Sequence, residues 1–142
     1  MDKFFYPGSI AIVGASSKRG SLSWDLVHNL IEYGYEGKIF PVNAKSDSVH
    51  SIKAYKSLTA IEDDVDLAII MVPKDFVAAV IDECGRKKIT AVIVITAGFK
   101  EAGKDGASME DVLKEKIKKY GMRLVGPNCM GIINTNKTVR LN

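Results

Sequence analysis

Small, hydroxyl-bearing and basic residues are concentrated in the segment 14–21, between a short apolar run and a stretch of helical periodicity. Glycine lets a backbone approach a ligand closely, and the start of a helix offers free N–H groups to a phosphate. These residue types favour phosphate binding, and the alternative is an ordinary turn with surface charges. The candidate residues are Gly14, Ser16, Ser17, Lys18, Arg19 and Gly20.

The glycine spacing separates this segment from two common phosphate-binding motifs. Five residues lie between Gly14 and Gly20, and Ser21 follows, which fits neither GxGxxG nor the GxxxxGK[ST] of P-loop nucleotidases. An NAD site also places a carboxylate after the second strand, where it accepts hydrogen bonds from the ribose. Lys45 stands there instead and suits a phosphate-bearing ribose, as in coenzyme A or NADP. Asp47 lies close by, and Lys45 as an ordinary surface residue is the alternative.

Three later segments carry further candidates for ligand contact. Val72 and Pro73 end one apolar run and offer a flat apolar surface to an adenine ring, and Thr96, Ala97 and Gly98 form a narrow turn after the next run. Simple strand termination explains both segments equally well. In the turn-rich segment 126–131, Asn128 is placed to hydrogen-bond a ligand amide.

Five short apolar runs alternate with segments of helical period. Continuous apolar strands are typical of parallel sheets, because crossover helices cover both faces. The sequence therefore predicts a Rossmann-like, three-layer α/β/α fold with a mainly parallel five-stranded sheet in the order 3-2-1-4-5. Ligands of such sheets bind at the carboxyl ends of the strands. The expected strands are residues 10–13, 37–42, 67–72, 91–95 and 122–125.

The expected helices connect these strands. One covers 24–31 with Ser23 as its cap, a second runs from a cap at Asp75 to about Gly85, and a third begins at Ser108. Their inward faces include Ile31, Phe76 and Val112, while the lysine run of the third helix is expected to face solvent. The stretch 52–61 suggests a short helix and a loop.

Composition limits the remaining classes of function. The chain has 142 residues, 46% hydrophobic and 26% charged, with a net charge of +3, which predicts one domain of ordinary size and does not suggest nucleic-acid binding. No run is long enough to cross a membrane and the start lacks a signal-peptide pattern, so a cytoplasmic protein is expected. The two cysteines, Cys84 and Cys129, form no CxxC, which disfavours a disulfide framework or a metal site.

A set of motifs in a fixed order resembles the coenzyme A-binding domain of ADP-forming acyl-CoA synthetases and, more distantly, the alpha subunit of succinyl-CoA synthetase. The similarity covers essentially the whole chain. Each motif is weak alone, and their order and spacing carry the resemblance. They are SIAIVGAS at 9–16, PVN at 41–43, AY at 54–55, VDLAII at 65–70, VP at 72–73, ECG at 83–85, ITAGF at 95–99, YGMR at 120–123 and GPNC at 126–129.

The resemblance implies coenzyme A as the cofactor and a role for each candidate segment. The loop 16–20 matches the family's phosphate and ribose loop, and Lys45 matches a lysine region near the adenosine end. Val72 and Pro73 correspond to the adenine-side wall, and the turn 96–98 to the turn beside the pantetheine arm. Asn128 and Cys129 belong to the GPNC loop near the thiol end.

At two positions the sequence departs from the family pattern, and these departures limit which residue roles can be carried over from the family. Ser23 replaces a glycine that is common shortly after the position of Gly20, and this change is expected to tighten the start of the helix. Ala97 stands where succinyl-CoA synthetases carry a glutamate, so no acid or base role is transferred to it.

The resemblance also implies partners, since synthetases of this kind use a phosphorylated histidine on a following succinyl-CoA ligase-like domain and a separate ATP-grasp domain. His28 lies in an expected helix and His50 in a polar loop, and neither matches that histidine. We therefore expect residues 1–142 to be a single CoA-binding domain, the first of a longer synthetase, with no catalytic residue of its own. The alternatives are a stand-alone CoA-sensing module and an NADP-binding oxidoreductase domain.

Overall fold

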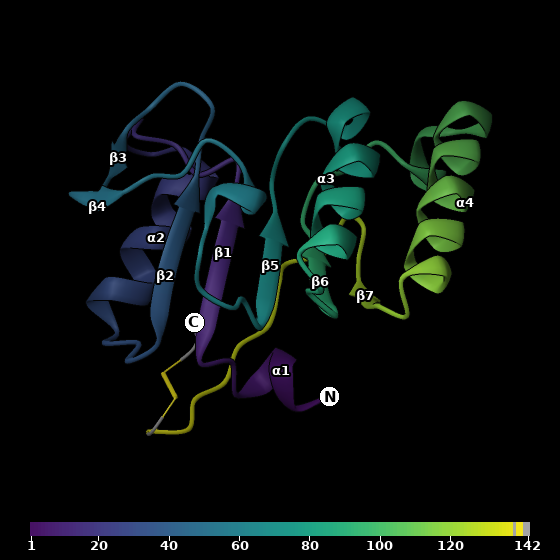
Figure 1. Ribbon diagram of the computed structural model, residues 1–142. Helices are drawn as coiled ribbons and strands as arrows, with labels where there is room; N and C mark the ends of the chain where they lie inside the picture. Colours follow the sequence, from purple (N-terminus) through teal and green to yellow (C-terminus); the bar gives the residue numbers. More distant parts are fainter. Residues whose placement is uncertain (138, 141–142) are drawn as a thin grey trace.

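Five parallel strands form the central sheet of the computed structural model, which describes residues 1–137 and 139–140. In Figure 1 the arrows of β1, β2 and β5 point toward the same edge of the sheet, so the carboxyl ends of these strands lie on one side. The spatial order is β2-β1-β5-β6-β7. The strands are β1 (Ser9–Val13), β2 (Lys38–Val42), β5 (Leu67–Ile70), β6 (Ala91–Val94) and β7 (Arg123–Val125).

The expected strand order of 3-2-1-4-5 is wrong at one position. The third long strand, β5, pairs with β1, with Ile10 opposite Leu67, and leaves β2 beyond β1. Two features account for this placement. Pro41 has no N–H for a second neighbour, which suits β2 to the outside of the sheet. The strand β5 is buried along its whole length and is therefore favoured in the interior.

The connection from β2 to β5 contains no long helix. It holds a two-stranded hairpin of β3 (Ser48–Val49) and β4 (Ile52–Lys53), followed by the short 3₁₀ helix η1 (Leu58–Ala60). The expected short helix and loop at 52–61 is thus partly confirmed, while the hairpin was not predicted. Tyr55 forms an isolated parallel β-bridge with Val42 at the outer edge of β2.

Helices cover both faces of the sheet, as the apolar strands predicted. One face carries α3 (Lys74–Arg86), α4 (Lys104–Lys119) and η1, and the other carries α2 (Leu22–Glu32), α1 (Asp2–Phe5) and the segment after β7. A second short 3₁₀ helix, η2 (Lys100–Ala102), precedes α4. Within the part of the chain that the structure describes, every helix is too short or too polar to span a bilayer.

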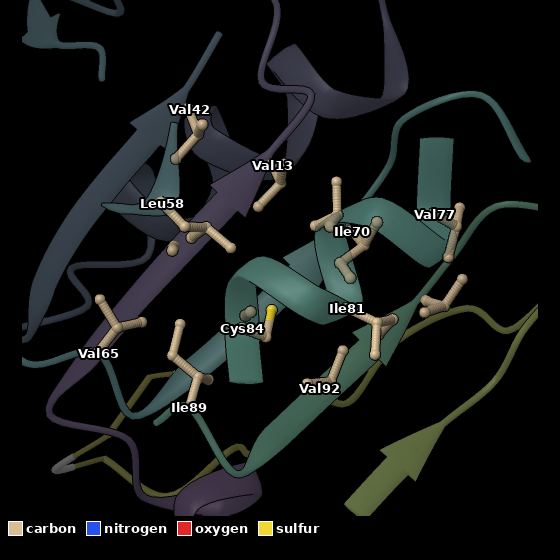
Figure 2. Packing of buried hydrophobic residues seen from close by; sticks show 14 of the residues in the cluster. Val13, Val42, Leu58, Val65, Ile70, Val77, Ile81, Cys84, Ile89 and Val92 are labelled. Atoms are coloured by element: carbon tan, nitrogen blue, oxygen red, sulfur yellow. The ribbon is translucent and has the colours of Figure 1, made fainter. Parts of the chain in front are cut away.

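The core under α3 shows how tightly these layers pack. Ile81 and Cys84 are fully buried, and Figure 2 shows them among the side chains of Leu58, Ile70 and Val92. Burial raises the pKa of the Cys84 thiol to about 12, so this cysteine acts as a small apolar side chain rather than as a nucleophile.

The helix starts differ from the expected ones by a few residues. Ser21 rather than Ser23 caps α2, because its Oγ accepts a hydrogen bond from the backbone N–H of Trp24 at 3.3 Å. The helix α3 begins at Lys74, directly after Pro73, so Asp75 lies in its first turn instead of capping it. The helix α4 begins at Lys104, four residues before Ser108.

Three side chains that were assigned to inward helix faces are instead exposed. They are Ile31, Phe76 and Val112, at 44%, 61% and 43% exposure. Each lies beside a correctly assigned buried neighbour, such as Leu30, Val77 or Leu113. The apolar periodicity therefore identified the helices, but it assigned one exposed residue of each helix to the buried face.

A polar contact joins α3 to α4 at the edge of the core. The carboxylate of Asp82 accepts hydrogen bonds from Lys116 Nζ at 2.6 Å and from the Tyr120 hydroxyl at 3.0 Å. The hydrogen bond from Lys116 lowers the pKa of Asp82 from its ordinary value. Asp82 and Lys116 are each only 26% exposed, so water screens this pair less than a surface ion pair.

The substitution Asp82→Asn is expected to lower the free energy of unfolding by about 1 kcal/mol at pH 7. Because the folded-state pKa is lowered, the stabilisation is present above the unfolded-state pKa of about 4 and is lost progressively as the pH falls from there through the lower folded-state pKa. Urea unfolding at pH 7 and pH 3 checks this. The control Asp111→Asn removes a 72%-exposed partner of Lys114 and should change little; an equal loss at both pH values for Asp82→Asn would contradict the account.

Candidate functional site

Backbone hydrogen bonds between neighbouring strands continue into the loops at their carboxyl ends. Each of these bonds fixes the start of one loop against the strand or loop beside it, so the loops that hold the candidate residues meet along one edge of the sheet. The bonds are Gly14 N to Val42 O at 3.0 Å, Met71 N to Val13 O at 2.8 Å, Ile95 N to Ile70 O at 3.0 Å and Asn128 N to Thr96 O at 3.1 Å.

Gly14 is required by the close contact between the β1 and β5 ends. Its φ is +92°, and a Cβ at this position would lie 3.0 Å from the Met71 carbonyl carbon and oxygen and 3.1 Å from Val72 N. A side chain would therefore both strain the backbone and push apart the two strand ends. This is the point where the strand order reverses, which is where ligands of such sheets bind.

The loop after Gly14 presents its polar groups to solvent at the start of α2. Ser16 Oγ accepts a hydrogen bond from Lys18 N at 3.0 Å, which curls the loop, and Ser17, Lys18 and Arg19 are exposed. The Arg19 guanidinium lies 5.7 Å from the centre of the Trp24 ring. Two cations beside a helix N-terminus form an electropositive surface that suits a phosphate.

Asn43 ties this loop to the loop that carries Lys45. Its Nδ2 donates to Ala15 O at 2.6 Å, while its Oδ1 accepts from Lys45 N at 2.7 Å and from Ser46 N at 2.9 Å. The hydroxyls of Ser17 and Ser46 lie 3.3 Å apart. The backbone of Lys45 is therefore linked through Asn43 to the basic loop, and its side chain is exposed. Asn43 was missing from the expected site residues, although its place directly after a strand was visible in the sequence.

A groove of about 500 Å³ lies beside the basic loop and is of the size that small-molecule ligands occupy. It brings together the predicted Val72, Pro73, Thr96 and Ala97, whereas the loop 14–20, Lys45, Gly98 and the loop 126–131 lie outside its lining. Thr96 Oγ1 donates to Val72 O at 2.7 Å and so joins the two walls. The full lining is Leu22, Ser23, Met71, Val72, Pro73, Ile95, Thr96 and Ala97.

Four lining positions and one neighbouring cation were not expected. Leu22 supplies apolar surface from α2, and Met71 and Ile95 supply it from the residues directly after β5 and β6. Ser23, expected as a cap, is buried and lines the groove instead. The Lys74 side chain lies against Gly98, whose φ is +100° and whose added Cβ would come within 3.0 Å of Lys74 Cδ.

The loop 126–131 is hydrogen-bonded to Thr96, a residue of the groove wall. The peptide bond between Gly126 and Pro127 is cis, and Asn128 has a φ of +53° and an exposed side chain. Cys129 is half-buried, with its Sγ 3.4 Å from Val94 O. The backbone bond from Asn128 to Thr96 places this loop beside the turn 96–98.

The two histidines lie outside the groove lining and pack against Trp24, His28 with its ring stacked and His50 with its ring tilted. The ring centres of Trp24 and His28 are 4.9 Å apart, those of Trp24 and His50 are 4.1 Å apart, and His50 Nε2 lies 3.2 Å from Trp24 O. These contacts attach the β3–β4 hairpin to α2, which is a structural role.

A doubly covered parallel sheet, with a basic loop after its first strand and a groove at its carboxyl edge, defines a Rossmann-like cofactor-binding domain. Comparison with known families specifies it further: the model of the CoA binding domain family matches residues 8–135, and the chain belongs to that family. The predicted cofactor, coenzyme A, is thereby confirmed.

Curated relatives extend the match over nearly the whole chain. The alpha subunit of acetate–CoA ligase [ADP-forming] I from Pyrococcus furiosus is 45% identical over 139 residues, covering 95% of this chain and 30% of the relative. The 4-hydroxybutyrate–CoA ligase [ADP-forming] of Nitrosopumilus maritimus is 43% identical over 136 residues, covering 96% of this chain and 19% of the relative. The chain thus spans less than a third of the length of either relative.

Solved structures confirm the fold. A protein from Pyrococcus horikoshii OT3 has a TM-score of 0.93 and 49% identity, with 99% of this chain and 32% of that one covered. The apo form of the dinucleotide-forming acetyl-coenzyme A synthetase 1 of Candidatus Korarchaeum cryptofilum has a TM-score of 0.92 and 36% identity, with 99% and 30% covered.

A pair of glycine variants tests whether the β1–β5 contact is as tight as the structure shows. Gly14→Ala is expected to lower the free energy of unfolding by about 3 kcal/mol, from backbone strain and the clash with Met71. Gly20→Ala shares the positive φ, at +75°, but meets no atom within 4 Å, so it should cost only about 1 kcal/mol. Urea unfolding measures both, and equal losses would contradict the assigned close approach.

Proposed function

We propose that this domain binds coenzyme A across the carboxyl edge of its sheet and presents the thiol to chemistry performed by other domains. The observation that carries the proposal is the rigid connection of three parts at that edge: the basic loop, the Lys45 loop joined to it through Asn43, and the groove beside them. A basic end and an apolar channel match the two halves of coenzyme A, a phosphorylated nucleotide and a thin uncharged arm.

Each predicted residue has a role in this proposal. Gly14, Ser16, Ser17, Lys18, Arg19 and Gly20 form the phosphate and ribose loop, and Lys45 pairs with the 3′-phosphate. Val72 and Pro73 form the adenine-side wall. Thr96, Ala97 and Gly98 border the pantetheine arm. Asn128 and Cys129 lie near the thiol, and among residues 1–137 and 139–140 no side chain acts as a catalytic acid, base or nucleophile.

The larger enzyme is proposed to be an ADP-forming acyl-CoA synthetase that converts acyl-CoA, ADP and phosphate to the acid, coenzyme A and ATP. The support is that relatives named as ADP-forming CoA ligases are at least three times as long as the matched segment. Residues 1–142 would then be its first, CoA-binding domain, of which 138 and 141–142 lie outside the described residues. The partners would be a phosphohistidine-bearing ligase-like domain and an ATP-grasp domain.

A cytoplasmic location is part of the same proposal. Cys84 and Cys129 are both free thiols in the structure, which suits a reducing compartment. A stand-alone CoA-sensing module would have the same binding edge, and continuation of the reading frame into a histidine-bearing domain favours the synthetase over it.

Calorimetric titration of the purified chain tests the assignment of Lys45. Wild type is expected to bind coenzyme A more tightly than NADPH. Lys45→Ala should weaken coenzyme A about tenfold, since one charge-assisted contact to phosphate is lost, and should leave dephospho-coenzyme A nearly unchanged.

The control for that titration is Lys118→Ala, which removes a cation from the last turn of α4 and should alter neither affinity. Equal losses for coenzyme A and its dephospho form would contradict the role of Lys45. Tight NADPH binding without coenzyme A binding would contradict the proposed function as a whole and favour the oxidoreductase alternative.

A further inference from the structure

A second hollow, of about 190 Å³, lies on the α2 side of the sheet and is separate from the basic loop. Its floor is formed by side chains of β5 and β6 and of the residues that follow them, one wall by α2 and the other by the segment 130–133. The long helices α3 and α4 both lie on the opposite face, and on this face the short helix α1 contacts β6. The lining is Leu22, Asp25, Leu26, Asn29, Leu30, Leu67, Ile69, Met71, Ile93, Ile95, Met130, Gly131, Ile132 and Ile133.

The hollow is continuous with the groove described above. Leu22, Met71 and Ile95 line both of them. Met130, which is fully exposed, directly follows Cys129 in the loop 126–131, which is hydrogen-bonded to the groove wall at Thr96. A ligand arm that runs along the groove toward Cys129 therefore ends at the mouth of this hollow.

The lining chemistry selects an uncharged and largely apolar occupant. Its surface is mainly aliphatic, and only Asp25 and Asn29, both from α2, contribute polar side chains. No lysine or arginine stands among the lining residues. An occupant with a terminal carboxylate would meet Asp25 without a cation to offset the repulsion, and desolvating that carboxylate would cost further free energy.

The volume sets the size of the occupant. An apolar cavity of about 150 Å³ accommodates benzene, so a hollow of about 190 Å³ has room for a group of about four to six carbon atoms. A two-carbon group would leave most of the aliphatic lining without a contact.

We propose that this hollow is an acyl pocket, which receives an apolar acyl group of about four to six carbons from an acyl-CoA whose arm lies in the groove. The inference rests on the proposed function, in which the loop 126–131 holds the thiol end. It adds a subsite and a binding preference: apolar monocarboxylic thioesters are bound more tightly than dicarboxylic thioesters and than free coenzyme A.

Calorimetric titration with coenzyme A, isovaleryl-CoA and succinyl-CoA tests the acyl pocket. Wild type should bind isovaleryl-CoA about tenfold more tightly than coenzyme A, since apolar groups gain this much in a fitted pocket, and should bind succinyl-CoA no more tightly than coenzyme A. The half-buried Leu26 lines the hollow but not the groove. Leu26→Phe should therefore fill the pocket and abolish the preference for isovaleryl-CoA while leaving the affinity for coenzyme A unchanged.

Val112→Phe enlarges a half-exposed side chain on α4, on the opposite face, and should retain the full preference. Methyl NMR of the wild-type chain gives a reading that needs no variant: the Met130 and Ile132 signals should shift with isovaleryl-CoA and much less with coenzyme A. Coenzyme A binding without any preference for isovaleryl-CoA, or a preference that persists in a folded Leu26→Phe, would overturn the acyl pocket alone. Failure of coenzyme A itself to bind would overturn the proposed function and the pocket with it.

Discussion

The candidate site depends on the parallel pairing of β1 with β5. This pairing brings the ends of the two strands so close that only a glycine fits at position 14, with the Met71 carbonyl 3.0 Å from where a Cβ would stand. The carboxyl ends of the strands then share one edge, and backbone hydrogen bonds carry the register of the strands into the loops. A ligand therefore meets loops whose positions are fixed before it binds, and pre-organisation of this kind lowers the entropic cost of binding.

The polar and apolar parts of the edge are held by different means. At the basic end, Asn43 satisfies three backbone groups of two loops and keeps Lys45 beside the loop 14–20. In the groove, Thr96 joins the two walls through Val72 O. The charges themselves stay exposed and can reach a phosphate without a buried, unpaired cation. Stability is supplied elsewhere, by the cores under α2 and α3 and by the Asp82 contact between α3 and α4.

The strands, the parallel sheet and the segments of the site were predictable because each leaves a local pattern: an apolar run, a helical period, or small and basic residues after a strand. The strand order was not predicted correctly, because it depends on how the connection 43–66 passes β1, and only Pro41 hinted at the outer position of β2. The cap of α2 was displaced from Ser23 to Ser21, since two serines offer nearly equal local signals. The role of Asn43 arises only when two distant loops meet.

One continuous edge, formed by the loops after five strands, is proposed to bind coenzyme A. Titration of the isotopically labelled chain with coenzyme A, followed through its backbone amide NMR signals, tests this directly. If coenzyme A binds at this edge, the largest shifts will occur in the segments 14–20, 43–46, 72–74, 96–98 and 126–130. Shifts confined to the opposite end of the sheet, around Lys3, Thr90 and Arg123, would contradict it.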